Sequence, residues 1–333
     1  MIEGKRILVT GGAGFIGSHL VDALVADNEV TVLDDLSSGR REYVNEEASF
    51  AEVDVRDREA LADAIDDPDV VFHLAAAADT RRTSAGWDAP HDDLAINAEG
   101  TLNLLEALRT ADLDPRIVYA SSCAVYGNPE YEPIDEGHPY NPISPYGVHK
   151  LAGDRYVRAY HTEHGFDTTA LRIFNTYGPR QPRYVMYDFL QKLQADPDEL
   201  EVLGTGEQVR DYAYIDDTVS AFLLLADRGE AGEAYNVSGE AVISIRDLAA
   251  TMIDLLGLDT ELRFTGSSWK GDPVALRADV TKLRKLGYAP TVGIEEGLRR
   301  FVAAFEAAEG PIGETPLNVD DTPTVDVPRG PER

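Results

Sequence analysis

The sequence is poor in cysteine and contains no long apolar run. Cys123 is the single cysteine among 333 residues, which excludes a disulfide framework and a zinc site built from cysteines, and we predict no metal centre. No run approaches the ~18 consecutive apolar residues of a membrane-spanning helix. The first strand-like run, Ile7 to Val9, leads directly into a glycine-rich loop, unlike a signal peptide. These features predict a cytoplasmic protein without a membrane partner.

Lysine is also scarce, and acidic residues dominate the charge. The chain has 60 acidic and 30 basic residues, a formal net charge of -30, and only six lysines. Such a charge argues against binding to nucleic acid or to an anionic membrane, because both need basic patches. The composition is similar to that of halophilic cytoplasmic proteins, whose charged surface keeps them soluble at molar salt. With 43% hydrophobic residues, the chain still has enough apolar material for a sizeable core.

Short apolar strands alternate with helical patterns through the first half of the chain. This alternation predicts an α/β fold of the Rossmann type, with a doubly wound parallel sheet covered on both faces. The strands are expected at residues 6–10, 30–33, 70–75, 116–121 and 167–173, and the helices at 15–26, 58–64, 92–110 and 146–164.

The pattern loosens after Asn175 and predicts a smaller mixed α/β substrate domain. Short strands are expected at 201–203 and 233–237, and helices at 187–195, 215–228, 245–256, 281–286 and 294–308. We assign residues 1–174 to an NAD-binding domain, to which 215–240 return, and 175–214 with 241–309 to the substrate domain. Residues 310–333 have little apolar periodicity and predict a disordered acidic tail.

A glycine-rich turn joins the first strand to the first helix, in the run from Thr10 to Gly17. Gly11 and Gly14 permit a tight turn and a close approach to a pyrophosphate, and Gly17 permits close packing of helix on strand. Backbone N–H groups at Phe15 and Ile16 would face the phosphates from the positive end of the helix. The turn therefore predicts a dinucleotide site.

The second strand ends in an acidic residue about 20 positions after the turn, a spacing that favours NAD over NADP. Asp34 would accept from both ribose hydroxyls and repel a 2′-phosphate, although Arg40 and Arg41 follow within reach of the adenosine. The adenine edge is expected to contact Asp54 and Val55, which precede the helix expected at 58–64.

Tyr146 and Lys150 are spaced i, i+4, which places both on one face of a helix. An ammonium beside a phenol stabilises the phenolate, so Lys150 is expected to lower the pKa of Tyr146. Ser122 ends a strand of the parallel sheet, where side chains reach the ligand crevice. These three residues are the candidate catalytic set.

With these residues, the chain resembles the extended short-chain dehydrogenase/reductase family, in particular its nucleotide-sugar epimerases and dehydratases. The resemblance implies NAD that is reduced and reoxidised in each turnover, with Ser122, Tyr146 and Lys150 as catalytic residues. It also implies a nucleotide-diphosphate sugar held by Asn175 and Arg210, and a homodimer formed through helices 92–110 and 146–164. The motifs that carry the resemblance are Thr10–Gly17, His73–Ala76 (with Ala75 beside the cofactor), Asn97 with Gly100–Thr101, Ser121–Ser122 before Val125–Gly127, Tyr146 with Lys150, Arg172–Asn175 before Tyr177–Arg180, and Arg210–Tyr212 before Asp216–Asp217.

The residues after Ser122 distinguish between the reactions of this family. Related dehydratases and decarboxylases carry carboxylates there, whereas this chain has Cys123 and Ala124. Without an evident second acid or base, epimerisation at C4 through a 4-keto sugar is the simplest chemistry, with UDP-glucose and UDP-galactose as the leading pair. A 4,6-dehydratase, a 3,5-epimerase that uses Cys123, a 4-reductase and a non-catalytic dinucleotide-binding relative remain alternatives.

The last third of the chain departs from the related epimerases. They commonly have Arg-x-Gly-Asp, with the arginine on the diphosphate, whereas this chain has Lys270 and Asp272 in the corresponding run. Lys270 would supply a point charge without bidentate geometry, and Arg277 lies nearby in the sequence. These three residues are candidate substrate ligands. Sugars linked to dTDP or GDP remain alternative substrates.

The acidic composition predicts that stability depends on salt. At low ionic strength, repulsion among the surface carboxylates should destabilise the folded state, and salt should screen it. We expect the melting temperature to rise steadily between low and molar KCl in a calorimetric series. Melting curves that do not respond to salt would contradict the halophilic interpretation.

Overall fold

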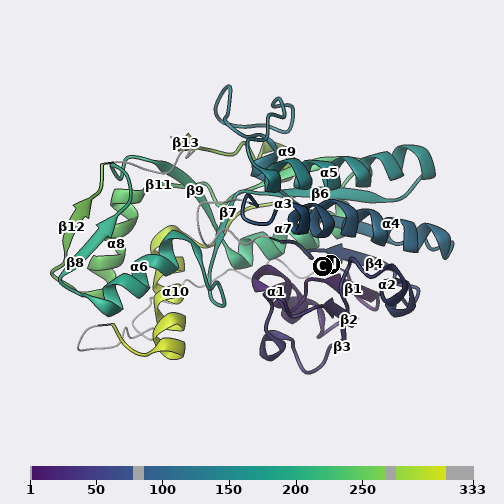
Figure 1. Cartoon of the computed structure of the whole chain (residues 1–333), viewed down its shortest axis with the longest axis horizontal. Helices are drawn as coiled ribbons and strands as arrows, with labels where there is room; N and C mark the ends of the chain where they lie inside the picture. Colours follow the sequence, from purple (N-terminus) through teal and green to yellow (C-terminus); the bar gives the residue numbers. More distant parts are fainter. Residues whose placement is uncertain (1, 78–85, 267–274, 313–333) are drawn as a thin grey trace, which may run out of the picture.

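A seven-stranded parallel sheet forms the centre of the larger part of the molecule (Figure 1). The computed structural model describes residues 2–77, 86–266 and 275–312. The sheet has the strand order β10-β6-β5-β4-β1-β2-β3. Its strands are β1 (Arg6–Thr10), β2 (Glu29–Asp34), β3 (Ser49–Glu52), β4 (Val70–His73), β5 (Arg116–Ser122), β6 (Thr168–Ile173) and β10 (Ala234–Val237). The predicted fold class is therefore confirmed.

The strand order reverses between β1 and β4. Successive strands move outward from β1 to β3, and the chain then returns to place β4 on the other side of β1. In parallel α/β sheets, a ligand crevice forms outside the carboxyl ends of the strands at such a reversal. The glycine-rich turn follows β1 at this point.

Helices cover both faces of this sheet because successive side chains of a strand point to opposite faces. Ile7 and Val9 belong to the core beneath α1 (Phe15–Leu24) and α7 (Ile215–Arg228). Leu8, between them, belongs to the core on the other face, beneath α2 (Arg58–Ala64), α4 (Gly100–Thr110) and α5 (Pro145–His164).

The helix expected at 92–110 is a composite. It begins at Pro90 as α3 (Pro90–Leu94), continues as a π-helical turn, η2 (Ala95–Glu99), and ends as α4. A π turn adds one residue to the helical repeat and rotates the following side chains. The strand expected at 70–75 ends two residues early, at His73.

The smaller part contains two further sheets. One has the order β11-β9-β13, with β7 also paired to β9, and the other pairs β12 with β8. The strands are β7 (Asn175–Tyr177), β8 (Glu199–Val202), β9 (Val209–Tyr214), β11 (Ala241–Ser244), β12 (Glu261–Phe264) and β13 (Ala275–Leu276). The remaining helices are α6 (Tyr184–Ala195), α8 (Ile245–Leu256), α9 (Thr281–Arg284) and α10 (Ile294–Glu309), with short 3-10 turns η1 (Arg41–Tyr43) and η3 (Cys123–Val125).

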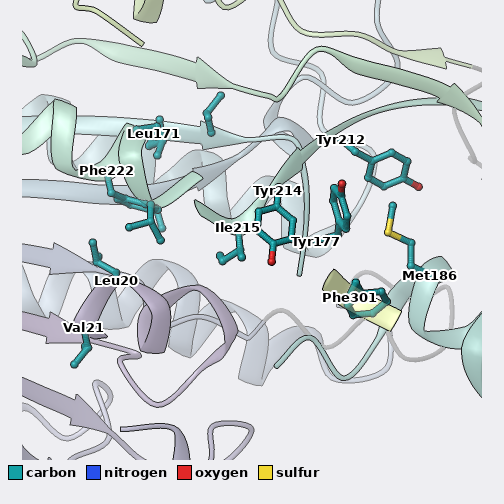
Figure 2. Packing of buried hydrophobic residues seen from close by; sticks show 14 of the residues in the cluster. Leu20, Val21, Leu171, Tyr177, Met186, Tyr212, Tyr214, Ile215, Phe222 and Phe301 are labelled. Atoms are coloured by element: carbon teal, nitrogen blue, oxygen red, sulfur yellow. The ribbon is translucent and has the colours of Figure 1, made fainter. Parts of the chain in front are cut away.

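Aromatic side chains from several elements fill the core at the junction with this part (Figure 2). The rings of Tyr212 and Tyr214 each lie edge-on to that of Tyr177. Met186 and Phe301 belong to the same buried cluster. This packing fixes β7 and β9 next to the end of the large sheet.

Among the described helices, none has the length and apolar character needed to cross a membrane. Of the residues assigned to the tail, 313–333 lie outside the described ranges.

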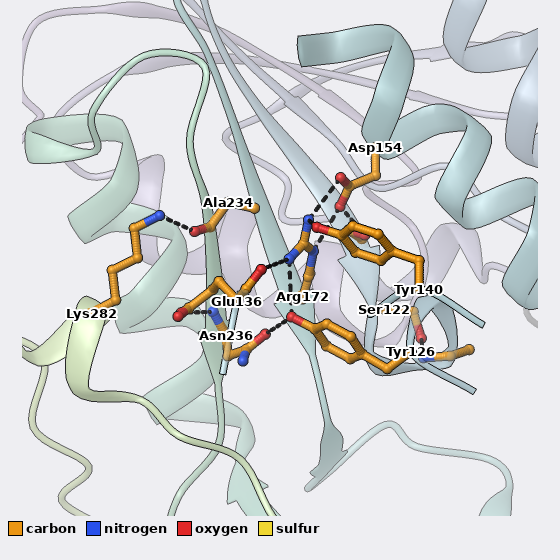
Figure 3. A network of polar contacts seen from close by, with 11 residues as sticks. Ser122, Tyr126, Glu136, Tyr140, Asp154, Arg172, Ala234, Asn236 and Lys282 are labelled. Atoms are coloured by element: carbon orange, nitrogen blue, oxygen red, sulfur yellow. Dashed lines mark hydrogen bonds and ion pairs between the residues drawn. The ribbon is translucent and has the colours of Figure 1, made fainter. Parts of the chain in front are cut away.

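A buried arginine joins β6 to the elements around it (Figure 3). Arg172, 1% exposed, donates to both carboxylate oxygens of Asp154 at 3.0 Å. It also donates to the hydroxyls of Tyr126 at 3.0 Å and Tyr140 at 2.7 Å. A buried charge with this many partners holds α5, the segment after β5 and β6 in one arrangement.

Replacing this arginine should destabilise the fold far more than replacing an exposed one. Arg172→Met leaves the Asp154 carboxylate buried without its cation, and we expect a loss of about 3–5 kcal/mol of unfolding free energy. The matched control is Arg263→Met, because Arg263 is 62% exposed in its pair with Glu199; there we expect at most about 1 kcal/mol. Urea unfolding in molar salt measures both, and equal losses would contradict the assignment.

Candidate functional site

The glycine-rich turn lies against the end of β4, at the reversal of strand order. Gly11 has a φ of +74°, and a Cβ added there would lie 2.6 Å from the backbone nitrogen of Ala75. A Cβ on Gly17 would collide with the carbonyl oxygen of Gly11. The Ala75 N–H donates to the Thr10 hydroxyl at 3.3 Å. Both glycines are therefore required by close backbone approach, and Ala75 forms one wall of the turn.

Helix α1 begins at this turn without a side-chain cap. Gly14 occupies the N-cap position, where the structure has no side-chain hydrogen bond. The first N–H groups of a helix have no partner within the helix, so those of Phe15 and Ile16 are available to an anion. These features fit a pyrophosphate at the N-terminus of α1.

Asp34 ends β2 and is tied to the same turn. Its two carboxylate oxygens accept from the N–H groups of Ala13, at 3.0 Å, and Leu36, at 2.9 Å. Burial raises the pKa of this carboxyl group above its usual value. Each oxygen keeps a further lone pair for a ribose hydroxyl. Asp34 therefore fits the predicted ribose contact and also shapes the loop that would hold the phosphates.

The two arginines near the adenosine end make contacts of their own. Arg40 pairs with Glu42 at 3.3 Å, and the Arg41 guanidinium lies 4.6 Å from the centre of the Phe50 ring.

The structure adds a constraint on the residues predicted to contact adenine. Asp54 pairs with Arg56 at 2.6 Å, and hydrogen bonds from Arg56 lower the pKa of Asp54. The buried Val55 accepts a hydrogen bond from Asn103 at 3.0 Å through its carbonyl. If the Asp54 carboxylate contacts adenine, it does so while it is also paired with Arg56.

The start of α5 brings the candidate catalytic residues to the end of β5. The Ser144 hydroxyl caps the helix by accepting from the Gly147 N–H at 3.1 Å. A Cβ on Gly147 would lie 2.6 Å from the carbonyl oxygen of Ala124, so the first turn of α5 packs closely on the segment after Ser122. Tyr146 and Lys150 follow on successive turns.

The pKa of Tyr146 does not follow the expectation from its spacing to Lys150. Burial raises the pKa of the phenol above its usual value, and the Ser122 hydroxyl acts in the opposite direction. The ammonium of Lys150 lies 4.4 Å from the centre of the Tyr119 ring instead. In the protein alone, burial is the dominant influence, and the prediction of a lowered pKa for Tyr146 is wrong for this state.

Lys150 is itself buried, with an exposure of 2%. Burial lowers the pKa of its ammonium to about 7, against the opposing influence of Asp93 and Asp154. Both protonation states of Lys150 are therefore populated near neutral pH. This brings one of the two expected proton-handling groups into the working range of an enzyme.

The candidate substrate ligands lie on the second sheet. The Asn175 side chain, on β7, donates to the carbonyl oxygen of Asp211 on β9 at 3.1 Å. Arg210 is on β9, and its charge opposes the burial that raises the pKa of Cys123, which places Arg210 near the end of β5. Arg277 has an exposed side chain and directly follows β13, which pairs with β9 at Arg210. Lys270 and Asp272 lie outside the described residues.

The sequence analysis missed Asp93 and His149, two polar residues beside the catalytic set. Asp93, on α3, accepts a hydrogen bond from His149 at 2.6 Å and one from Asn97 at 3.0 Å. The side-chain amide oxygen of Asn97 is buried and has no partner within the described ranges. Because 56 residues separate Asp93 from His149, no local pattern could have connected them.

Across the parts of the chain that the structure describes, no three His, Cys, Asp or Glu side chains converge in a way that could hold a metal ion.

The chain is similar to proteins of known chemistry along most of its length. A family model, described as the NAD dependent epimerase/dehydratase family, matches residues 7–238. The UDP-glucose 4-epimerase of Mycolicibacterium smegmatis is 36% identical over 312 residues, which cover 90% of this chain and 98% of the relative.

Two solved structures show the same architecture with different chemistries. A UDP-N-acetylglucosamine 4-epimerase from Methanobrevibacter ruminantium, in complex with UDP-N-acetylmuramic acid, has a TM-score of 0.85 and 32% identity, covering 92% of this chain and 99% of its own. A dTDP-glucose 4,6-dehydratase from Streptomyces venezuelae, solved with NAD bound, has a TM-score of 0.83 and 32% identity, covering 92% and 98%.

The backbone approach at Gly11 yields a test of the dinucleotide site. In Gly11→Ala, the methyl group would displace Ala75 in addition to straining a positive φ, and we expect NAD affinity to fall at least about tenfold, or about 1.4 kcal/mol. The control is Gly4→Ala, since Gly4 has a φ of +63° with nothing within 4 Å of an added Cβ. Titration calorimetry with NAD compares the two, and normal binding by Gly11→Ala would argue against this turn as the phosphate site.

Proposed function

Because the chain belongs to the NAD dependent epimerase/dehydratase family, we propose that it inverts C4 of a nucleotide-diphosphate sugar, with UDP-glucose and UDP-galactose as the substrate pair. The prediction of an enzyme with NAD as its cofactor is confirmed. The choice of reaction and of sugar is the proposal.

The observation that carries the choice of reaction is the chemistry next to Ser122. A dehydratase or a 3,5-epimerase needs a group that removes a proton from C5, and the two available positions hold Cys123 and Ala124. Burial raises the pKa of the Cys123 thiol to about 11, so it stays protonated at neutral pH. Alanine has no titratable group. The site then has one evident acid–base residue for the sugar, Tyr146, which is sufficient for epimerisation at C4.

In this proposal, the protein moves one proton and holds the sugar. Tyr146 takes the proton of the 4-hydroxyl, while Ser122 hydrogen-bonds the same oxygen. NAD, held by the glycine-rich turn after β1 and by Asp34, would supply the hydride chemistry at C4. Between these steps the 4-keto sugar rotates to present its opposite face, and Tyr146 then returns the proton to the oxygen at C4. Lys150 stabilises the phenolate that exists in the interval.

The diphosphate would anchor the substrate while the sugar turns. Arg210 and Asn175 belong to the paired strands β9 and β7, and Arg277 follows β13, which pairs with β9 at Arg210. A guanidinium matches phosphate oxygens in charge and geometry. We keep Lys270 and Asp272 as candidate ligands.

We further propose that the chain forms a homodimer through α4, α5 and the adjoining α3. Support comes from two exposed apolar side chains on helices that pack together: Leu94 on α3, 45% exposed, and Val148 on α5, 48% exposed. A second copy would remove them from water.

The assignment of the two ligands to separate domains is also part of the proposal. Residues 1–174 with 215–240 would bind the dinucleotide, and 175–214 with 241–309 the sugar nucleotide, in a halophilic cytoplasm. The return of β10 to the large sheet, next to β6, and the separate sheet around β9 support this division.

The reaction can be tested with UDP-glucose in molar KCl. We expect proton NMR to show UDP-galactose signals growing to a constant ratio, and Tyr146→Phe to slow the reaction by about 10²–10⁴-fold because the proton acceptor is gone. Tyr156→Phe, on the same helix, is the control and should react like the parent. Loss of the C6 hydroxyl would indicate a dehydratase, and net consumption of NADH a reductase; Tyr146→Phe at parental speed would remove the assigned base.

A further inference from the structure

Lys150 is buried, and the two carboxylates that favour its charged form, Asp93 and Asp154, have different hydrogen-bond partners. Asp154 is already neutralised, because Arg172 donates to both of its oxygens at 3.0 Å and the Ser121 hydroxyl donates to one at 2.8 Å. The arginine is permanently charged. Of the two carboxylates, Asp93 therefore has the larger influence on the pKa of Lys150.

Among the described residues, Asp93 has no such permanent cation. It is 4% exposed, and one of its oxygens accepts both from the His149 ring at 2.6 Å and from the Asn97 amide at 3.0 Å. Within the described ranges, His149 is the only basic side chain in hydrogen-bond contact with this carboxylate. An imidazole can hold a carboxylate by hydrogen bonding while it is neutral.

The position of Asp93 is fixed against the start of α5. A Cβ on Gly86 would lie 2.6 Å from the second Asp93 oxygen and 3.0 Å from the backbone nitrogen of Tyr146. His149, which holds the first oxygen, directly precedes Lys150 in the same helix. The carboxylate on α3 therefore lies against the part of α5 that carries Tyr146 and Lys150.

The other titratable groups that the structure describes around Lys150 are neutral. On the β5 side it faces the Tyr119 ring, at 4.4 Å, and burial raises the pKa of that phenol. On the β4 side, burial and the charge of Lys150 lower the pKa of His73 to about 3, so its imidazole is uncharged. Within its own helix, Tyr146 is a neutral phenol with a raised pKa.

We propose that Asp93 is the counter-charge of Lys150 and that His149 is the residue that holds Asp93 in this position. Both are positioning residues, since they act on proton transfer through Lys150. The electrostatic part of the inference is independent of the reaction, whereas its consequence for turnover rests on the proposed function. The direction of the effect follows from charge: an anionic Asp93 favours the ammonium, so its removal lowers the pKa of Lys150.

The experiment is a titration of the lysines in intact protein. The chain has six lysines, so the side chains of ¹³C-lysine-labelled protein give few NMR signals, and Lys150→Met identifies that of Lys150. Asp93→Asn keeps the oxygen that accepts from His149 and Asn97, and we expect the midpoint of the Lys150 titration to fall by about one pH unit or more. Asp92→Asn, an exposed neighbour on α3, is the matched control and should leave the midpoint unchanged.

Two further variants separate charge from structure. Asp93→Glu restores the charge and should bring the midpoint back toward that of the parent. His149→Gln keeps an N–H donor for Asp93 and should leave the midpoint at or above the parental one. An unchanged midpoint in Asp93→Asn, or a fall in His149→Gln as large as that in Asp93→Asn, would overturn the proposal.

Turnover provides an independent measurement. If C4 epimerisation is the reaction, Asp93→Asn should lower kcat near neutral pH by about tenfold, with the alkaline limb of the kcat profile displaced by the same amount as the NMR midpoint. KM should change little. A displaced midpoint in a protein without epimerase activity would contradict the proposed function alone, and activity with an unmoved midpoint would contradict the role of Asp93 alone.

Discussion

The burial of one lysine ammonium at the edge of the large sheet constrains much of this structure. A cation without water needs a negative partner, yet each buried carboxylate supplied for it needs compensation of its own. Arg172 compensates Asp154 and connects it to β6 and to the hydroxyls of Tyr126 and Tyr140. The packing of α5 on the sheet and the charge of Lys150 are therefore parts of a single electrostatic arrangement.

A second constraint is steric, and it acts at the reversal of strand order. β1 and β4 are neighbours there, so the turn after β1 must pass the backbone of Ala75 with no room for a side chain at Gly11. At the same turn, the start of α1 has no side-chain cap and the Asp34 carboxylate accepts from the Ala13 N–H. A crevice with backbone donors on one side and a carboxylate on the other follows from the sheet topology, and α5 adds the proton-handling groups.

Local patterns in the sequence were sufficient for much of this arrangement. The helices at Ile215–Arg228 and Ile245–Leu256 have the predicted bounds, because each has a clear apolar face. The π turn at Ala95–Glu99 was missed, since one added residue hardly disturbs an apolar pattern. The sheet around β9 was missed for another reason. Its strands are two to six residues long, and they pair segments that are distant in the sequence. Pairing of this kind leaves no periodic signal.

The site shows the same division between local and distant information. The i, i+4 spacing placed Tyr146 and Lys150 on one helix face, but the direction of the pKa shift of Tyr146 depends on burial, which spacing does not report. Asp93 illustrates the consequence, because it acts on both groups: its charge favours the ammonium of Lys150 and disfavours the phenolate of Tyr146. A carboxylate in that position assists the base only through the lysine. Burial therefore favours the protonated phenol of Tyr146 in the protein alone, and further positive charge near the hydroxyl would favour the phenolate.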